Sequence, residues 1–260
     1  MLQEKTAVYY GKTAYEALEF VSLSHAFFSY PKHCHISSYT MGIVLKGKLF
    51  VCVNQTTTLC EKNDVFTICP YEMHELQSLG VYDLLVMSLK KSFLEHYPLE
   101  KAHKIVSKYL GILIGAKLLD VASSDKLLNK LPLLYAHHQH EKCHNPFEPI
   151  KEFLETYPEE SIDVEHLSRF SAMSKYHFIR KFDENVGMTP HQFHIQNRVR
   201  KAKSMLEETD SLTEAGMNAG FYDQSHFIRQ FKHLYQISPS SYKAACIDLD
   251  ALAQSGEKLC

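Results

Sequence analysis

Two arginines at equivalent positions of an internal repeat are the residues with the clearest chemistry. Residues 177–190 (HFIRKFDENVGMTP) and 226–239 (HFIRQFKHLYQISP) lie 49 positions apart and agree at six of fourteen positions. Arg180 and Arg229 are the fourth residue of each copy. A guanidinium group donates two parallel hydrogen bonds to the O6 and N7 atoms of guanine, which makes arginine the commonest reader of that base. The pair therefore predicts contacts to the bases of double-stranded DNA.

The phenylalanines around these arginines predict two amphipathic helices. Phe178 and Phe182 are four residues apart, and Phe227 and Phe231 repeat that spacing. Side chains at i and i+4 share one face of a helix, so we expect each pair to be buried and each arginine to point outward. Each helix is preceded by a residue suited to capping its first turn, Ser174 and Asp223 respectively.

A shorter helix is predicted upstream of each copy, over residues 162–170 and 212–219. A tight turn at residues 171–173 follows the first, and Gly220, which suits a left-handed helix end, follows the second. A short helix, a tight turn and a second helix with a polar outer face form the helix-turn-helix plan. A helix over about 191–208, with basic residues between 198 and 203, connects the two units. Such a pair can present two reading helices one DNA turn apart, roughly 34 Å.

In these residues the sequence resembles the AraC/XylS family of transcription regulators. The string GFYDQSHFIRQFKHLYQISPSSYK (220–243) is similar to the family signature, and LSRFSAMSKYHFIRKFDENVGMTPHQF (167–193) is similar to its first unit. The string RVRKAKSML (198–206) resembles its connecting helix, so the resemblance covers about 100 residues. It implies reading helices over 175–185 and 224–234.

The resemblance also implies a role for each outward residue. One major groove would be faced by Lys175, Tyr176, His177 and Arg180. The next would be faced by Gln224, Ser225, His226, Arg229 and Gln230. Phosphate contacts would come from Lys201, Lys203 and Lys232. The sequence departs from the family at Ala215 and Gly216, where larger residues are usual, so we expect a looser helix there. Asp183 and Glu184 also place acid where a base is common, which would lower non-specific affinity.

The N-terminal half has the pattern of a β-protein. Residues 39–45, 49–53 and 65–68 are rich in β-branched and aromatic residues and are bounded by turn residues. Short strands at close spacing favour a sandwich or a small barrel. PKHCHISSYTMGIVLKG (31–47) and NDVFTICPYEMH (63–74) resemble the two motifs of the cupin barrel. The expected fold class is α+β in two domains: a cupin-like barrel with following helices, then an all-α tandem helix-turn-helix domain.

Histidines in the cupin-like motifs are the second set of residues with possible chemistry. Odd positions of a strand share a face, which predicts that His33, His35, Tyr39 and Met41 point into the barrel, where His74 would approach them. We favour a small-molecule effector pocket lined by these residues. Two alternatives stay open: a Zn, Fe or Ni site, since three neutral imidazoles suit these metals, and a polar core. No cofactor is expected.

Residues 91–142 are predicted to be helical and to end in a linker. An apolar stripe there could pair two subunits or pack on the barrel; its members are Leu127, Leu128, Leu131, Leu134 and Tyr135. The linker carries a group that could chelate a metal but is more typical of a solvated segment: His137, His138, His140, Cys143 and His144. We expect a barrel domain over 1–95, a helical dimerisation segment and linker over 96–146, a DNA-binding domain over 147–246 and a tail over 247–260.

Composition limits the other possibilities. The net charge is −2, and residues 151–246 contain 12 basic and 13 acidic residues, so DNA binding must depend on how charge is distributed. The seven cysteines are odd in number and form no CxxC pair, which favours reduced thiols in the cytoplasm over a disulfide framework. No apolar run is long enough for a membrane span, and no leader sequence is apparent at the N-terminus.

The sequence therefore favours a transcription regulator that is not an enzyme, since no nucleophile triad, phosphate loop or carboxylate pair is recognisable. Its expected partners are promoter DNA, RNA polymerase, a small-molecule effector and a second copy in a homodimer. The alternative is a cupin metalloprotein, or a metal or redox sensor, with a DNA-binding appendage. Cys34 and Cys69 lack an activating basic neighbour at fixed spacing, which disfavours a cysteine sensor.

Overall fold

The computed structural model describes residues 6–15, 17–140, 146–209 and 211–255. The chain divides into two compact units, residues 1–141 with 245–260, and residues 142–244. The first unit contains the strands and the helices that follow them, and the second is helical, which confirms the expected α+β class. Within the described residues, none of the helices has both the length and the apolar character needed to cross a bilayer.

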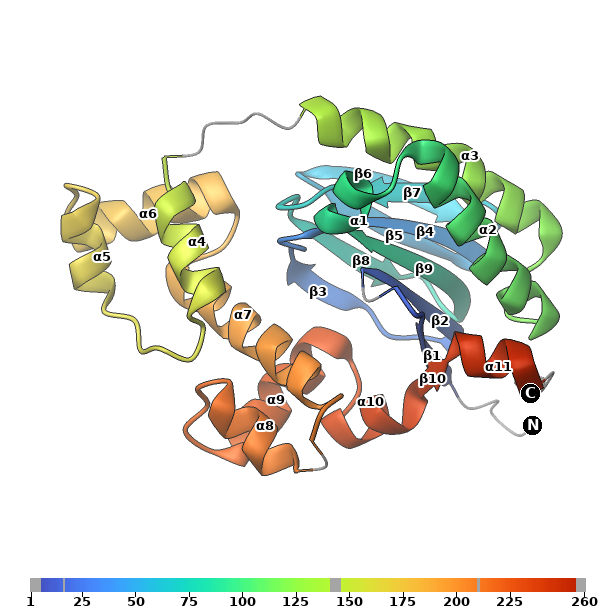
Figure 1. The fold of residues 1–260 in the computed structure, drawn as a ribbon. Coiled ribbons are helices and arrows are strands. Elements are labelled where there is room, and N and C mark those ends of the chain that lie inside the picture. Colours follow the sequence, from blue (N-terminus) through green and yellow to red (C-terminus); the bar gives the residue numbers. More distant parts are fainter. Residues whose placement is uncertain (1–5, 16, 141–145, 210, 256–260) are drawn as a thin grey trace. The chain divides into compact units, whose positions relative to one another are not determined.

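The strands of the first unit form two sheets (Figure 1). In chain order they are β1 (Ala7–Lys12), β2 (Leu18–Ala26), β3 (Tyr30–His33), β4 (Ser38–Lys46), β5 (Lys48–Val53), β6 (Thr56–Glu61), β7 (Val65–Ile68), β8 (His74–Ser78), β9 (Tyr82–Lys90) and β10 (Cys246–Asp248). One sheet has the order β10-β1-β2-β9-β4-β7, and the other has the order β3-β8-β5-β6. The strands expected at 39–45, 49–53 and 65–68 are confirmed as β4, β5 and β7.

Helices cover the six-stranded sheet on the face away from the other sheet (Figure 1). They are α1 (Lys91–His96), α2 (Leu99–Gly115), α3 (Val121–His140) and α11 (Leu249–Ser255). Strand β4, which lies between β9 and β7, is buried on both faces, and this explains its nearly continuous apolar sequence. Gly42 in β4 makes room for a ring, since a Cβ there would lie 2.1 Å from the Phe66 ring.

The two faces of the six-stranded sheet pack into different cores. The face toward the helices carries Tyr39, Met41, Ile43, Leu85, Met87 and Leu89. The face toward the four-stranded sheet carries Leu23, Val44, Ile68 and Leu84, packed with Leu49, Val51 and Leu76. Leu127, Leu131 and Leu134 of α3 belong to the first of these cores and are fully buried. The apolar stripe on α3 therefore packs on the barrel within one chain; pairing of two copies through this segment stays a prediction.

The second unit is a bundle of seven helices within the described part of the chain. They are α4 (Glu148–Thr156), α5 (Val164–Phe170), α6 (Lys175–Val186), α7 (Pro190–Met205), α8 (Leu212–Asn218), α9 (Gln224–Tyr235) and α10 (Pro239–Ala245). The long helix α7 contacts α4, α6, α8 and α9, and so forms the centre of the bundle. A capping box between Thr189 and Gln192 begins α7, with Pro190 at its first position, where proline is favoured.

The C-terminal segment belongs to the first unit, contrary to the expectation of a separate tail over 247–260. β10 pairs in parallel with β1, opposite Tyr10, Gly11 and Lys12. Leu249 at the start of α11 is fully buried, and a Cβ on Gly11 would lie 2.9 Å from its Cδ1 atom. This pairing could not be predicted, because a three-residue strand is too short for a periodic pattern and its partner lies at the other end of the chain.

Candidate DNA-binding surface and barrel histidines

The first helix-turn-helix unit consists of α5, a tight turn and α6. The carboxylate of Asp163 caps α5 by accepting a hydrogen bond from the Glu165 amide at 2.8 Å. Ala172 in the turn has a left-handed backbone with φ 52°, and the Met173 amide donates to the Ser168 carbonyl at 2.9 Å. Ser174 is the N-cap of α6, as expected, although its side chain makes no capping hydrogen bond.

The phenylalanines of α6 face the core as the spacing predicted. Phe178 and Phe182 are fully buried, and the Phe147 ring packs edge-on against both at 5.9 and 5.4 Å between centroids. The residues expected to read DNA lie on the other side of α6 and are all exposed: Lys175, Tyr176, His177 and Arg180. The Arg180 side chain is 71% exposed, and its contact with Glu184 is a surface ion pair of 3.7 Å between Nε and Oε1. Such pairs contribute little, so DNA could readily replace this one.

The second unit, made of α8, a turn and α9, repeats this design. Gly220 occupies the left-handed turn position with φ 91°, and the Phe221 amide donates to the Gly216 carbonyl at 3.0 Å. Asp223 caps α9 by accepting from the His226 amide at 2.7 Å. One additional residue, Tyr222, lengthens this turn relative to the first, and its side chain is 95% exposed.

The outer face of α9 carries the second set of residues that are expected to contact DNA. Phe227 and Phe231 are fully buried, whereas Gln224, Ser225, Arg229 and Lys232 are exposed. His226 and Gln230 are half-buried: their Nε2 atoms lie 3.4 Å apart, and the His226 ring packs edge-on against Phe221. These two side chains therefore also help to pack the turn.

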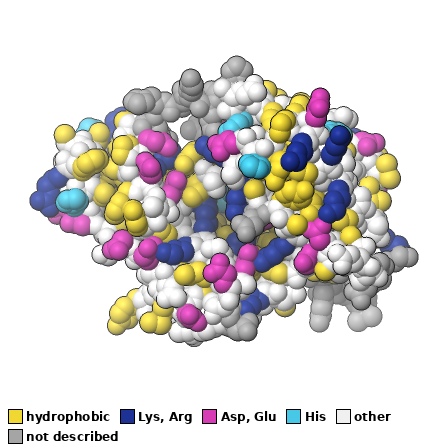
Figure 2. Space-filling view, in the orientation of Figure 1, with side chains coloured by type: hydrophobic (Ala, Val, Ile, Leu, Met, Phe, Trp, Pro, Cys, Tyr) yellow, Lys and Arg dark blue, Asp and Glu magenta, His cyan; other side chains and the backbone are white. Residues whose placement is uncertain are grey.

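The basic residues of α7 have partners inside the second unit. Lys201 Nζ lies 2.6 Å from Glu159 Oε2, and this hydrogen bond lowers the pKa of the Glu159 carboxyl. The ammonium of Lys203 lies over the rings of Tyr235 and Tyr242. Contacts from Lys201 and Lys203 to phosphate stay predictions and would require exchange of these partners. Figure 2 shows basic and acidic side chains interspersed over the visible face, consistent with the net charge of −2.

The unusual small residues in α8 have a packing reason. Ala215 and Gly216 are both buried, and a Cβ on Gly216 would lie 3.0 Å from the Phe227 ring. The absence of a side chain lets α8 approach α9 closely. The helix expected to be loose is therefore closely packed against its neighbour.

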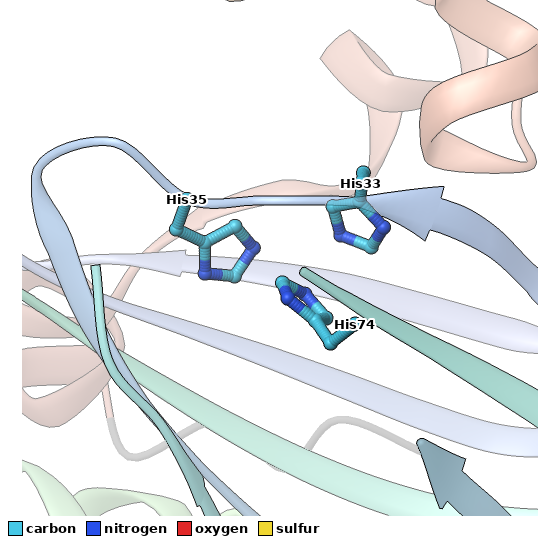
Figure 3. A group of neighbouring side chains, drawn as sticks. All are labelled: His33, His35 and His74. Atoms are coloured by element: carbon cyan, nitrogen blue, oxygen red, sulfur yellow. The ribbon is translucent and has the colours of Figure 1, made fainter. Parts of the chain in front are cut away.

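The three barrel histidines converge (Figure 3). Their potential ligand atoms all lie within 4.8 Å of one another. Ring centroids are 4.1 Å apart for His33 and His74, 4.7 Å for His35 and His74, and 5.4 Å for His33 and His35. His33 ends β3 and pairs directly with His74 at the start of β8, while His35 lies in the segment that leads to β4.

Tyr39 and Met41 do not share this site, and the prediction that they point the same way as the histidines is wrong. Both lie in the core beneath the helices, and the Tyr39 hydroxyl contacts His138 Nδ1 of α3 at 3.3 Å. Thr40, on the opposite face of β4, contacts His35 instead. Side chains alternate between the two faces of a sheet within one strand, but the irregular segment between β3 and β4 interrupts this alternation. The odd-numbered residues of β4 therefore lie on the opposite face from the one predicted.

The linker cluster lies only partly within the described residues. His137 and His138 are at the end of α3, and His138 packs edge-on against Tyr39 with 5.8 Å between ring centroids. Cys143 and His144 lie outside the described residues, as does the side chain of His140. Cys34 is fully buried and Cys69 is half-buried.

Comparison with known proteins identifies the domain family of both units. Residues 17–143 match the family model of the AraC-like ligand binding domain, and residues 167–245 match that of a helix-turn-helix domain. The chain is a transcription regulator of the AraC type. Its N-terminal unit is a ligand-binding domain, and its second unit is a DNA-binding domain, as the resemblance implied.

Relatives of this regulator carry the same description. It is 24% identical to the uncharacterised regulator YbfI of Bacillus subtilis, over 81% of this chain and 85% of that one. It is 32% identical to the regulator MtrA of Neisseria gonorrhoeae over 87 residues, which are 33% of this chain and 29% of MtrA. An apo structure of ToxT from Vibrio cholerae has the same fold, with a TM-score of 0.60 and 14% identity over 90% of this chain and 99% of that one.

Proposed function

We propose that the regulator inserts α6 and α9 into successive major grooves of promoter DNA and reads bases with Arg180 and Arg229. One observation carries the proposal: both arginines are exposed at equivalent positions of two helices whose phenylalanine pairs are buried. The groove-facing set on α6 is completed by Lys175, Tyr176 and His177. On α9 it is completed by Gln224, Ser225, His226 and Gln230. Lys232 is exposed and suits a phosphate contact.

Substitution of the two arginines tests this assignment. Arg180→Ala and Arg229→Ala should each weaken specific binding by about 1–3 kcal/mol and relax base choice at one position of the site. Lys104→Ala, which removes an exposed charge from α2 of the other unit, is the matched control and should bind as the parent does. The measurement is a selection of binding sites from random duplexes, followed by mobility-shift titration. If both arginine variants select the same bases with the same affinity, these residues do not read DNA.

The N-terminal unit would hold the effector that regulates this binding. ToxT from Vibrio cholerae has been solved with an unsaturated fatty acid bound, with a TM-score of 0.52 and 13% identity to this chain. At that identity the likeness supports the fold and not the chemistry of the ligand. In this chain we assign the effector region to the polar cluster of His33, His35 and His74. A ligand that binds one conformation better than another shifts the population, and thereby the affinity for DNA.

Three further parts complete the proposal. The regulator acts in the cytoplasm on promoter DNA, it contacts RNA polymerase, and it performs no reaction itself. Two copies would pair through surfaces other than the apolar stripe of α3, which is buried in a single chain. Run-off transcription with and without the protein tests the polymerase contact, and sedimentation at several concentrations tests pairing.

A further inference from the structure

We propose that Tyr222 is a further residue that determines base choice, and that its ring packs against the C5-methyl group of a thymine in the major groove entered by α9. The inference rests on the insertion of α9 proposed above. Tyr222 lies in the turn directly before this helix, outside the residues assigned to the groove so far. Among the four bases only thymine presents a methyl group in the major groove, where apolar side chains contact it.

The tyrosine ring is far more exposed than packing requires. Among the described residues, the two most exposed large apolar side chains are Tyr222 at 95% and Tyr176 at 85%. Each lies at the start of a reading helix, the end that meets base edges in helix-turn-helix proteins. Ser225 has in α9 the position that Tyr176 has in α6. Each unit therefore presents one tyrosine at the leading end of its reading helix, although the two tyrosines come from different positions.

One additional residue in the second turn releases Tyr222 from the fold. An apolar residue directly before the N-cap of a helix often packs against the fourth helical residue. In the first unit that position holds Met173, which is half-buried. In the second unit it holds Tyr222, but the preceding Phe221 is buried and packs on Phe227, with 5.5 Å between ring centroids. Phe221 therefore supplies the packing, and the ring of Tyr222 is left to solvent.

The backbone on either side of Tyr222 is fixed. The Phe221 amide donates to the Gly216 carbonyl at 3.0 Å, and the Asp223 carboxylate accepts from the His226 amide at 2.7 Å. A tyrosine has two side-chain torsions, so it gives a large contact area for a small loss of conformational entropy. The ring is thus already positioned for a contact and loses little freedom when it binds.

The charges around Tyr222 favour a base over the phosphate backbone. From residue 204 to residue 228 the sequence has no lysine or arginine and five acidic residues. One of these is the adjacent Asp223, whose side chain is exposed. A carboxylate next to the ring repels phosphate, whereas the uncharged methyl group of thymine is not affected by it. The contact is therefore assigned to the apolar face of the ring and not to the hydroxyl group.

The position of this thymine follows from the helix. Tyr222 precedes Arg229 by seven residues, which corresponds to about 10 Å along the helix axis. Base pairs of a duplex are about 3.4 Å apart along its axis. We therefore expect the thymine about three base pairs from the guanine that Arg229 reads, on the side of the helix N-terminus.

Removal of a single methyl group from the DNA tests the contact. The sites selected by the parent are synthesised with deoxyuridine in place of each thymidine in turn, and binding of the full chain is titrated by mobility shift. At one thymine the parent should bind about fourfold more weakly, the factor expected for one apolar carbon group. Tyr222→Ala should bind the thymine duplex about tenfold more weakly than the parent and should show no further loss with uracil.

Two variants separate the ring from its hydroxyl group and from exposed aromatic residues in general. Tyr222→Phe keeps the ring and should distinguish thymine from uracil as the parent does. Phe27→Ala, which removes an exposed ring from the ligand-binding unit, is the matched control and should bind both duplexes as the parent does. A loss of affinity in Tyr222→Phe equal to that of Tyr222→Ala would assign the contact to phosphate through the hydroxyl group and overturn the inference.

The same selection distinguishes this inference from the assignment of the arginines. If Arg229→Ala relaxes base choice while Tyr222→Ala selects the parent site with the parent affinity, the arginine assignment stands and the role of Tyr222 is wrong. The inference also falls if no uracil substitution weakens binding of the parent. If neither variant changes the selected bases, α9 does not read this DNA and both proposals fall.

Discussion

At the scale of single residues, His194 is the one buried side chain among the described residues whose ring nitrogens form no hydrogen bond of normal geometry, although the Glu160 backbone is near enough to oppose slightly the lowering of its pKa. It lies in α7 and is 2% exposed. Burial, followed by the positive charge of Arg198, lowers the pKa of this histidine to about 4. The ring is therefore neutral in the native protein at neutral pH, and it acts as an apolar filler at the centre of the bundle.

This histidine predicts that the DNA-binding unit loses stability in mild acid. Below pH 6.5 the unfolded chain binds a proton on His194 that the native state, with its pKa of about 4, does not accept. Stability is full above pH 6.5 and falls as the pH drops toward 4, by about 2 kcal/mol at pH 5. The measurement is amide hydrogen exchange of α7 at pH 7 and pH 5, corrected for intrinsic rates.

Two substitutions on α7 separate this effect from general acid sensitivity. His194→Leu should remove most of the difference between pH 7 and pH 5. His191→Asn, at an exposed position of the same helix, should keep most of it, since the charge of His191 lowers the pKa of His194 less than burial and Arg198 do. An equal loss of protection in the parent and in His194→Leu would show that another group is responsible.

Sequence reasoning succeeded for residues whose environment is set by their own helix. The spacing of Phe178 and Phe182 was enough to place Arg180 outside, because both follow from one helical period. The same reasoning failed for Tyr39, because the alternation of side chains along β3 does not continue through the irregular segment before β4. It also missed the partner of Lys201, because Glu159 lies 42 residues away in sequence.

At the scale of elements, the two helix-turn-helix units differ in how they make the same turn. Both place one residue in the left-handed region, Ala172 with φ 52° and Gly220 with φ 91°. A left-handed backbone costs a residue with a Cβ about 1–2 kcal/mol, whereas glycine adopts it readily. The first unit therefore carries strain that the second avoids.

Separate substitutions of these two turn residues should change the stability of the second unit in opposite directions. Ala172→Gly should raise the free energy of unfolding of the second unit by up to about 1 kcal/mol, because it relieves the left-handed alanine at an exposed position. Gly220→Ala should lower it by more, since a Cβ there would lie 2.7 Å from the backbone of Glu159. Chemical unfolding followed by circular dichroism measures both. A lower stability for Ala172→Gly would contradict the interpretation of the turn.

The elements themselves were largely predictable, and their assembly was less so. The phenylalanine spacing predicted two amphipathic helices, and the family resemblance supplied their bounds; these helices, the connecting helix and three strands all lie within a few residues of the expected ranges. The sequence could not say which face of β4 meets the helices, because that strand is apolar on both sides. It also left open whether the stripe on α3 packs on the barrel or on a second copy, since both would bury the same leucines.

At the scale of the whole molecule, the chain leaves the ligand-binding unit before the DNA-binding unit and returns to it afterwards. Specific contacts hold the C-terminal segment to the ligand-binding unit. The Asp250 carboxylate accepts hydrogen bonds from the Tyr109 hydroxyl at 2.7 Å, the Ala14 amide at 2.9 Å and Lys108 Nζ at 2.5 Å. Partial burial raises the pKa of Asp250, but these hydrogen bonds outweigh it and hold the pKa below its usual value. The DNA-binding unit is thus joined to the ligand-binding unit at both of its ends.

Because Leu249 anchors this return, its truncation should destabilise the ligand-binding unit and not the helical bundle. Leu249→Ala removes a fully buried side chain from the core beneath α2 and should cost about 2–5 kcal/mol. Leu252→Ala, at a half-buried position of the same helix, should cost less. Hydrogen exchange resolved by segment can separate the two units: protection should fall in β1 and α2 and stay unchanged in α6 and α9. If protection in β1 is unaffected by Leu249→Ala, the C-terminal segment contributes nothing to the stability of the ligand-binding unit, and a single linker would suffice to describe how the units are joined.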